Sequence, residues 1–307
     1  MEFLRFLEDL RTPWLDQLML FITSFGEELV FIGIAVTLLW CINKYQGYYM
    51  LSVGFIGMQI NQLLKVLFRI ERPWVRDPSF EAVDAAKAQA TGYSFPSGHT
   101  QNAVGTFGSI ARWCKTRWIG IVCWTLAVLV AFSRMYLGVH TPADVLVSFV
   151  VAAVLVFALY PIFRDADKNP RRVRMLLCVL LVWAIAQIFF MEFFPFPAAA
   201  EGERLYSGLI NAYKIAGVAV GFVIAFELDQ RVIRFETSAV WWAQMLKLVI
   251  GLALTFGAKE LGGLLFDQIP YAPIGKALEY LVMVLFAACV WPLTFRWFAR
   301  LGRKDAT

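Results

Sequence analysis

The chain contains two histidines, His99 and His140, and each stands in a short polar cluster beside an apolar stretch. An imidazole can act as a nucleophile, or it can give and take protons near neutral pH. Asp144 follows His140 by one helical turn, so a helix would bring its carboxylate to the ring nitrogen that does not react. There it would orient the ring and stabilise an imidazolium. We therefore predict a histidine nucleophile with an orienting carboxylate, and a second histidine that moves protons.

Three cationic side chains, Lys65, Arg72 and Arg134, also lie at the ends of apolar stretches. Charge is costly at membrane depth, so cations that are kept there usually have a function. Guanidinium groups match the oxygens of a phosphate, and a lysine ammonium adds a compact charge. Ser97 and Gly98 precede an expected helix start, where free backbone N–H groups and the helix dipole attract an anion. These residues predict a phosphate-binding site that needs no metal ion.

Each of these residues also has a purely structural interpretation. The sequence Thr141-Pro142-Ala143-Asp144 is a good helix start, so Asp144 can cap a helix with or without a role in chemistry. Lys65 and Arg72 can extend from a helix end to the membrane interface. Pro96-Ser97-Gly98 is typical of a turn before a helix. The sequence alone leaves both interpretations open.

The composition determines where such a site can lie. Hydrophobic residues make up 60% of the 307-residue chain and charged residues 17%, against about 25% charged in a typical soluble domain, and the mean hydropathy is +0.64. This excludes a soluble enzyme, a disordered chain and a disulfide scaffold. The net charge of +5 does not indicate nucleic-acid binding, because the basic residues lie in short connections between apolar runs. The five cysteines are interpreted as small buried hydrophobic residues.

The apolar runs predict an all-α, polytopic membrane helix bundle. A spanning helix needs about 20 apolar residues, and the runs lack the alternation of barrel strands. Residues 1–11 have one apolar and one charged face at helical spacing, which predicts an amphipathic helix in the membrane interface. About nine membrane-spanning helices are predicted, at residues 28–42, 48–68, 100–113, 118–137, 143–163, 173–194, 209–226, 240–266 and 274–298.

Alternating passes bring the polar clusters together. The ends of the second and fourth predicted spans and the starts of the third and fifth lie on one membrane face, so three segments far apart in the sequence converge there. More lysine and arginine residues fall in the loops of the opposite face, and loops rich in these residues stay in the cytoplasm. We therefore expect the N-terminus and the active site outside, the C-terminus in the cytoplasm, and a bacterial inner membrane as the location.

A basic connection at residues 164–174, RDADKNPRRVR, predicts a domain boundary. Residues 1–165 would form a core with all three clusters, and residues 166–307 a C-terminal membrane unit whose role is open. Homodimerisation through the C-terminal helices is one option. Gly217 and Gly221 form a small-xxx-small pattern, which is typical of close helix packing. The one long connection, residues 74–95, would lie on the outer face and cover the substrate.

The three clusters together resemble a known signature. Their residues and spacing are similar, at every position, to the three-part signature of the type-2 phosphatidic acid phosphatase superfamily: Lys65, Arg72 and Pro73; then Pro96, Ser97, Gly98 and His99; then Ser133, Arg134, His140 and Asp144. The resemblance implies that His140 attacks phosphorus and forms a phosphohistidine, and that Asp144 orients it. His99 would protonate the leaving oxygen and then activate water. The phosphate-binding residues that it implies are Lys65, Arg72, Ser97, Gly98 and Arg134.

The resemblance implies a membrane phosphatase that uses no metal ion or other cofactor and binds no nucleic acid. Its substrate would be a phospholipid or isoprenoid phosphate, such as undecaprenyl pyrophosphate, phosphatidylglycerol phosphate or phosphatidic acid, whose tail stays among the membrane lipids. Two alternatives stay open. Glucose-6-phosphatase resembles this superfamily, so a soluble sugar phosphate is a second substrate class. The ionisable residues in the later spans leave a lipid transporter or an inactive receptor as a different class; they are Lys214, Lys247, Lys259 and Glu260.

Overall fold

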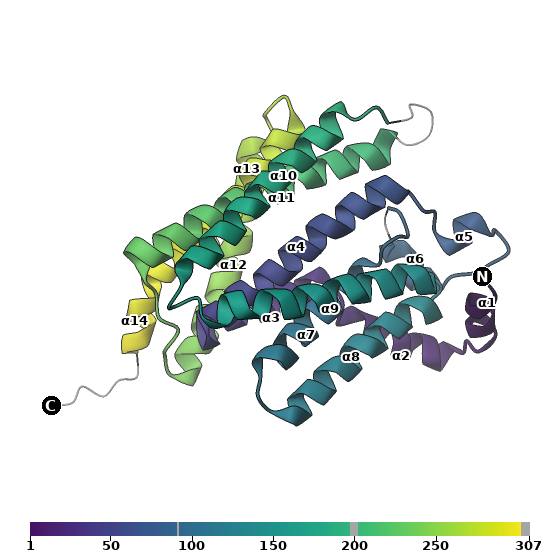
Figure 1. Cartoon of the computed structure of the whole chain (residues 1–307), viewed down its shortest axis with the longest axis horizontal. Helices are drawn as coiled ribbons and strands as arrows, with labels where there is room; N and C mark the ends of the chain where they lie inside the picture. Colours follow the sequence, from purple (N-terminus) through teal and green to yellow (C-terminus); the bar gives the residue numbers. More distant parts are fainter. Residues whose placement is uncertain (91, 197–201, 302–307) are drawn as a thin grey trace. The chain divides into compact units, whose positions relative to one another are not determined.

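A computed structural model describes residues 1–90, 92–196 and 202–301 of the chain. Every regular element in these ranges is a helix, as predicted (Figure 1). The helices belong to two compact units. The first comprises Met1–Ala35 and Tyr48–Arg164, and the second comprises Val36–Gly47 and Asp165–Thr307. The separate roles predicted for residues 1–165 and 166–307 stay predictions.

The first unit contains the helices from α1 to α9, of which α3 and α4 extend by a few residues into the second unit. In chain order they are α1 (Glu2–Asp9), α2 (Pro13–Ser24), α3 (Glu28–Thr37), α4 (Lys44–Phe68), α5 (Pro73–Arg76), α6 (Asp84–Gln89), α7 (Gly98–Trp113), α8 (Arg117–Tyr136) and α9 (Pro142–Arg164).

Local sequence explains where these helices begin. Thr12 caps α2 by accepting a hydrogen bond from the Leu15 N–H, and Pro13 takes the first position, where a missing N–H costs nothing. Ser97 caps α7 in the same way through the Thr100 N–H. Such caps satisfy backbone donors that would otherwise be left without partners in an apolar environment.

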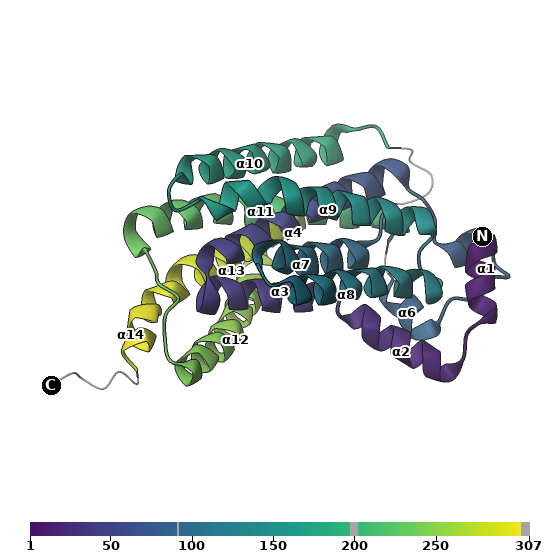
Figure 2. The same cartoon turned by 60° about the horizontal axis from the view of Figure 1, so that its bottom comes forward.

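Helix α7 is the buried centre of the first unit. It packs against α8 and α9, as Figures 1 and 2 show. The approach is close, because a Cβ at Gly108 would lie 3.2 Å from Val156 Cγ2 and 3.3 Å from Trp124. Phe107 and Val130 are buried in the apolar cluster that these helices share. Small residues let the helices approach, and the packing holds the start of α7 in place.

The second unit is built from α-helices joined by short π-helical and 3-10 segments. They are η1 (Leu38–Ile42), α10 (Pro170–Phe193), α11 (Gly202–Leu228), η2 (Asp229–Ile233), α12 (Trp241–Phe266), α13 (Ala272–Leu285), η3 (Phe286–Val290), η4 (Trp291–Thr294) and α14 (Phe295–Arg300). The predicted close packing is confirmed, because a Cβ at Gly217 would clash with the Ala277 carbonyl oxygen. A Cβ at Gly221 would lie 2.7 Å from Val284 Cγ1, so α11 and α13 pack at close range.

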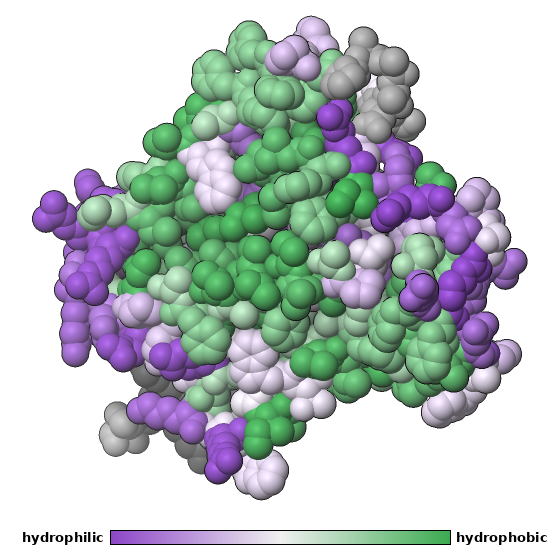
Figure 3. Space-filling model, turned by 45° about the vertical axis from the view of Figure 1, so that its right-hand side comes forward, coloured by the Kyte–Doolittle hydropathy of each residue, from purple (hydrophilic) through white to green (hydrophobic). Residues whose placement is uncertain are grey.

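Seven helices in the described ranges are long and apolar enough to cross a membrane, so this is an integral membrane protein. An eighth crossing results if Pro13–Ser24 and Glu28–Ile42, which meet at a bend of 42°, form one broken span. The predicted count of about nine is not confirmed. The 16 residues of α7 measure about 24 Å, against a hydrocarbon core of about 30 Å. Figure 3 shows wide apolar areas on one face, with hydrophilic side chains toward its margins.

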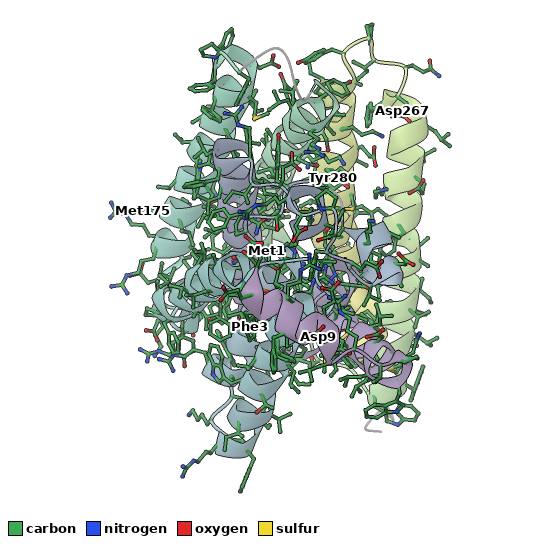
Figure 4. All side chains as sticks on the ribbon, turned by 90° about the vertical axis from the view of Figure 1, so that its right-hand side faces the viewer. Met1, Phe3, Asp9, Met175, Asp267 and Tyr280 are labelled. Atoms are coloured by element: carbon green, nitrogen blue, oxygen red, sulfur yellow. The ribbon has the colours of Figure 1, made fainter. Side chains whose placement is uncertain are left out.

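Helix α1 forms where the sequence predicts an amphipathic helix (Figure 4). Leu4 is buried, whereas Phe3 on another side of the helix is 44% exposed. Arg5 pairs with Asp77 in the connection between α5 and α6, at 2.7 Å between Nη2 and Oδ2. The position of α1 in the membrane interface stays a prediction.

Lys44 and Asp229 form an ion pair inside the second unit. Asp229 is fully buried, its Oδ2 lies 3.0 Å from Lys44 Nζ, and its Oδ1 accepts a hydrogen bond from the Phe235 N–H. We predict that Asp229→Ala lowers the free energy of unfolding by about 3 kcal/mol, because both donors would lose the carboxylate. The midpoint of thermal unfolding in detergent measures this loss, with Glu236→Ala at an exposed position as the control. An unchanged midpoint for Asp229→Ala would contradict the prediction.

Candidate active site

The candidate residues all belong to the first unit, at the ends of its helices. Lys65 lies in the last turn of α4 and Arg72 directly before α5; Ser97, Gly98 and His99 begin α7; Arg134 lies in the last turn of α8; His140 and Asp144 flank the start of α9. The three sequence clusters meet through direct contacts. Arg72 Nη1 lies 3.0 Å from His140 Nε2, and the Ser97 N–H donates to the Asp144 carbonyl at 3.2 Å. The charges of Lys65, Arg72 and Arg134 act on both histidines.

The turn that carries His140 follows from the sequence at the end of α8. Gly138 has φ +76°, a left-handed conformation that glycine adopts without strain. Its N–H donates to the Met135 carbonyl at 3.0 Å, and the Val139 N–H donates to the Arg134 carbonyl at 3.2 Å. These two hydrogen bonds are those of a Schellman motif, which closes a helix. His140 therefore emerges at a defined place between α8 and α9.

Asp144 makes the contacts expected of a helix cap and also those expected of a residue that orients His140, the two interpretations that the sequence left open. Its Oδ2 accepts a hydrogen bond from the Thr141 N–H at 2.8 Å, and its own N–H donates to Thr141 Oγ1 at 3.3 Å. This is a capping box at the start of α9. The same Oδ2 lies 3.5 Å from His140 Nδ1 and accepts a hydrogen bond from Ser94 Oγ at 2.5 Å. One buried carboxylate thus caps a helix and faces the imidazole.

The contact between Arg72 and His140 determines the tautomer of the imidazole. A guanidinium carries donors and no acceptor, so His140 Nε2 accepts with its lone pair. The proton of the neutral ring then lies on Nδ1, on the side of the Asp144 carboxylate. His140 and Asp144 are 2% and 1% exposed. The basic nitrogen of the buried ring therefore faces the guanidinium.

Burial lowers the pKa of His140 well below its ordinary value, because a charged imidazolium is poorly solvated there. The Asp144 carboxylate, 3.5 Å from Nδ1, acts in the opposite direction because it stabilises the imidazolium, and the positive charges of Arg72, Arg134 and Lys65 lower this pKa further. His140 is consequently neutral at neutral pH. A neutral ring has the lone pair that a nucleophile requires.

Lys65 and Arg72 donate to neutral backbone oxygens. Lys65 Nζ donates to the Tyr93 carbonyl at 2.6 Å. Arg72 donates to the carbonyls of Gly92 at 3.2 Å and Val139 at 2.9 Å. Arg72 is 6% exposed, so its side chain is enclosed by the protein. Among the described residues, no group of three or more His, Cys, Asp or Glu side chains can hold a metal ion, and the groups suited to a phosphate here are the cations.

Arg134 and His99 each have one buried side-chain nitrogen without a hydrogen-bond partner among the described residues. Arg134 is 1% exposed and donates from Nη1 to Thr23 Oγ1 at 2.8 Å, while its Nε has no hydrogen-bond partner among the described residues. In the same part of the chain, the buried His99 Nε2 has none either. A Cβ at Gly98 would meet no atom within 4 Å, so open space borders the start of α7. Backbone N–H groups at a helix start suit an anion in such a space.

The side chains of Ser94 and Thr23 contact the candidate site from outside the three sequence clusters. Ser94 stands directly before the Pro96-Ser97-Gly98-His99 cluster, so its position next to a motif was a usable signal. Thr23 is 111 residues from Arg134 along the chain. No spacing in the sequence pairs Thr23 with Arg134, and only the folded chain reveals the contact.

Comparison with known proteins gives matches over most of the chain. The PAP2 superfamily model matches residues 44–168, and a model described as PAP2 superfamily phosphatase, transmembrane extension matches residues 213–304. Phosphatidylglycerophosphatase B of Bacillus subtilis is 32% identical over 178 residues, which are 54% of this chain and 81% of that protein. The chain belongs to the PAP2 superfamily. The resemblance seen in the sequence is thereby confirmed.

Other PAP2 relatives act on different lipid phosphates by name. Undecaprenyl-diphosphatase BcrC of Bacillus subtilis is 32% identical over 150 residues, 48% of this chain and 74% of that protein. Sphingosine-1-phosphate phosphatase 1 of Mus musculus is 28% identical over 156 residues, 48% of this chain and 34% of that protein. No solved structure matches the chain. This PAP2 protein is an enzyme, a membrane-embedded lipid phosphatase.

The hydrogen bond from Ser94 to Asp144 gives a first prediction for this PAP2 enzyme. We predict that Ser94→Ala lowers kcat about 10-fold, because the Asp144 carboxylate loses a charge-assisted hydrogen bond and holds the imidazole less firmly. Phosphate release by the purified enzyme measures the effect, and Ser238→Ala in the second unit is the control. A Ser94→Ala enzyme with wild-type kcat would show that this hydrogen bond does not matter for turnover.

The protonation of His140 can be measured directly, because the chain has two histidines. In a His99→Asn variant without a histidine tag, ¹⁵N NMR would report His140 alone. We predict a neutral ring protonated on Nδ1, and a pKa below the usual value of about 6.5, since burial and three cations disfavour the imidazolium. The neutral form therefore persists as pH falls below 6.5 and is lost only at lower pH. A pKa at or above 6.5, or a proton on Nε2, would contradict the prediction.

Proposed function

We propose that this enzyme hydrolyses a lipid phosphate or pyrophosphate through a phosphohistidine formed on His140. One observation carries the proposal: Arg72 contacts one ring nitrogen of His140, and Asp144 lies beside the other. The named activities of the bacterial relatives, an undecaprenyl-diphosphatase and a phosphatidylglycerophosphatase, support the substrate class. The candidate substrates are undecaprenyl pyrophosphate, phosphatidylglycerol phosphate and phosphatidic acid.

In the first step, the lone pair of His140 Nε2 attacks phosphorus. The bond between phosphorus and the leaving oxygen breaks, and that oxygen receives the proton of His99 in its imidazolium form, which the negative charge of the bound phosphate would stabilise. The ring becomes positively charged as the N–P bond forms, so the Asp144 carboxylate beside Nδ1 stabilises it. The products of this step are phospho-His140 and the lipid leaving group.

In the second step, His99 acts as a base. It removes a proton from a water molecule, whose oxygen attacks phosphorus while the N–P bond breaks. The electron pair of that bond returns to His140 Nε2, and inorganic phosphate leaves. The buried His99 Nε2, which has no hydrogen-bond partner among the described residues, is available for both proton transfers.

The phosphate-binding group of this proposal is Lys65, Arg72, Ser97, Gly98 and Arg134. Its cations would face the oxygens of the phosphoryl group, whose charge is redistributed in the transition state. The cations are already buried and oriented by the fold, so little reorganisation is needed when charge develops. The open space beside Gly98 would let the phosphate reach the N–H groups of α7.

We further propose that the reaction takes place on the extracytoplasmic face of a bacterial inner membrane. The distribution of lysine and arginine residues in the sequence supports an N-terminus outside and a C-terminus in the cytoplasm. The site lies at helix ends, where a headgroup can enter while the tail stays in lipid. In this arrangement α1 lies in the membrane interface, and α7 is a short ninth crossing. Residues 1–165 form the phosphatase core, and residues 166–307 form a membrane unit that can support dimerisation.

The nucleophile is tested by His140→Ala. We predict a loss of at least about 10³ in the rate of phosphate release, because the covalent route is then closed. Release is measured in detergent with EDTA present, from undecaprenyl pyrophosphate, phosphatidylglycerol phosphate, phosphatidic acid and glucose-6-phosphate. The exposed Glu236→Ala variant, purified in parallel, is the control.

The matched variant His99→Asn separates the two steps. Both steps use His99, but the phosphate leaving group of a pyrophosphate can depart without a proton. With undecaprenyl pyrophosphate labelled with ³²P at its terminal phosphate, an acid-labile phosphoenzyme should therefore accumulate in His99→Asn, which lacks the base for the second step, and be absent from His140→Ala. Wild-type release by His140→Ala would end the phosphohistidine proposal. Phosphate release from glucose-6-phosphate alone would identify a soluble sugar phosphate as the substrate class. If the folded wild type releases phosphate from none of the four substrates, a transporter or a receptor would be favoured.

A further inference from the structure

The corner between α2 and α3, residues Thr23–Glu27, lies against the candidate active site although neither family match includes it. Those matches begin at residue 44. The corner is where the two helices meet at a bend of 42°. It is closed by local hydrogen bonds, from the Gly26 N–H to the Thr23 carbonyl at 2.9 Å and from the Glu27 N–H to the Ser24 carbonyl at 3.1 Å. The corner is therefore a formed turn and can serve as a support.

Thr23 contacts the Arg134 guanidinium directly. Thr23 Oγ1 accepts a hydrogen bond from Arg134 Nη1 at 2.8 Å, and the two residues are 2% and 1% exposed. No carboxylate of the described residues lies within ion-pair distance of Arg134, although the charge of Glu27 acts on it at longer range. The hydroxyl of Thr23 is thus the side-chain group that orients this buried cation.

The corner also packs on His99. A Cβ at Gly26 would lie 2.8 Å from the His99 carbonyl oxygen, 3.1 Å from His99 Cβ and 2.8 Å from Val130 Cγ1. Val130 lies about one turn before Arg134 on α8. A glycine is therefore required at residue 26, and it lets the corner touch α7 and α8 at once. Any movement of Thr23 away from Arg134 would have to disturb this packing.

A neutral acceptor suits a cation that has to bind phosphate. A carboxylate in the place of Thr23 would neutralise Arg134 and compete with the substrate for the guanidinium. A hydroxyl accepts one hydrogen bond from the guanidinium, restricts the rotation of the arginine side chain, and leaves its positive charge available. Arg174 in the second unit shows the contrast, because its guanidinium pairs with the Glu227 carboxylate.

We propose that Thr23 is a positioning residue for phosphate binding, which acts by holding the Arg134 guanidinium toward the site. The proposal rests on the proposed function, in which Arg134 binds the phosphoryl oxygens. It extends the active-site support beyond the two family matches to the N-terminal segment. Thr23 itself does not touch the substrate.

The test compares Thr23→Val, Thr23→Ser and Thr23→Ala. Valine has the shape of threonine but no acceptor, and serine retains the hydroxyl. We expect Thr23→Val and Thr23→Ala to weaken inhibition by inorganic phosphate about 10-fold, because a buried guanidinium loses its acceptor and its orientation. Thr23→Ser should stay within about 2-fold of the wild type. Ser24→Ala, which removes a hydroxyl that donates to the Phe21 carbonyl on the same helix, is the matched control and should have no effect.

The readouts are the inhibition constant of phosphate, KM and kcat on the lipid that the wild type hydrolyses, and the unfolding midpoint in detergent. If Thr23 has a merely structural role, Thr23→Val and Thr23→Ala will lower the unfolding midpoint and leave the inhibition constant of phosphate unchanged. This result would overturn the proposal. If Thr23→Val does not fold, the comparison of Thr23→Ala with Thr23→Ser decides in the same way.

Arg134→Gln, which removes the positive charge, distinguishes failure of this inference from failure of the proposed function. If phosphate inhibition weakens in Arg134→Gln and not in the Thr23 variants, Arg134 binds phosphate without help from Thr23, and only the further inference is lost. If Arg134→Gln retains wild-type phosphate inhibition and turnover, the phosphate-binding role proposed for Arg134 is wrong, and the inference falls with it.

Discussion

The concentration of positive charge at the active site is the constraint on which the rest of the first unit depends. Lys65, Arg72 and Arg134 are brought close enough to act on the same histidines, and Asp144 is the carboxylate in contact with His140. Buried like charges destabilise the folded state unless each is held and hydrogen-bonded. Neutral oxygens hold these cations, so the attraction for an anion is not cancelled inside the protein. In the proposed reaction a bound phosphate supplies the opposing charge, so binding relieves the repulsion that destabilises the empty site.

Backbone hydrogen bonds at helix ends fix the positions of the side chains at the candidate active site. The Schellman motif at Gly138 sets the direction of the chain before His140, and the capping box of Thr141 and Asp144 sets the start of α9 directly after it. The Ser97 N–H then bonds to the Asp144 carbonyl, which ties the start of α7 to the start of α9. These hydrogen bonds satisfy donors that lie in an apolar surrounding, so the interactions that stabilise the helix ends also place the reacting groups.

The sequence was sufficient for features that depend on short-range order. The spacing from His140 to Asp144 followed from helical periodicity, the helix start after Ser97 from the turn residues before it, and the convergence of helix ends from alternating passes; the structure places these residues accordingly. The number of membrane crossings did not follow, because α7 is short and the bend between α2 and α3 has no sequence signal as clear as an internal proline. The contact of Thr23 with Arg134 could not be predicted for a different reason. It joins two segments that are far apart in the sequence, and a single threonine is too common a residue to indicate such a contact.

The contact of Arg72 with His140 determines when the proposed nucleophile becomes reactive. Before substrate binds, the lone pair of Nε2 is engaged by the guanidinium, which limits its attack on anything else. A phosphate oxygen is a stronger acceptor for Arg72 than a neutral imidazole, because that hydrogen bond is assisted by opposite charges. In the proposed reaction the substrate therefore draws the guanidinium to itself and leaves Nε2 free beside the phosphorus, while Asp144 keeps the ring oriented through Nδ1. Phosphate binding and activation of the nucleophile are then one event, driven by the same excess of positive charge.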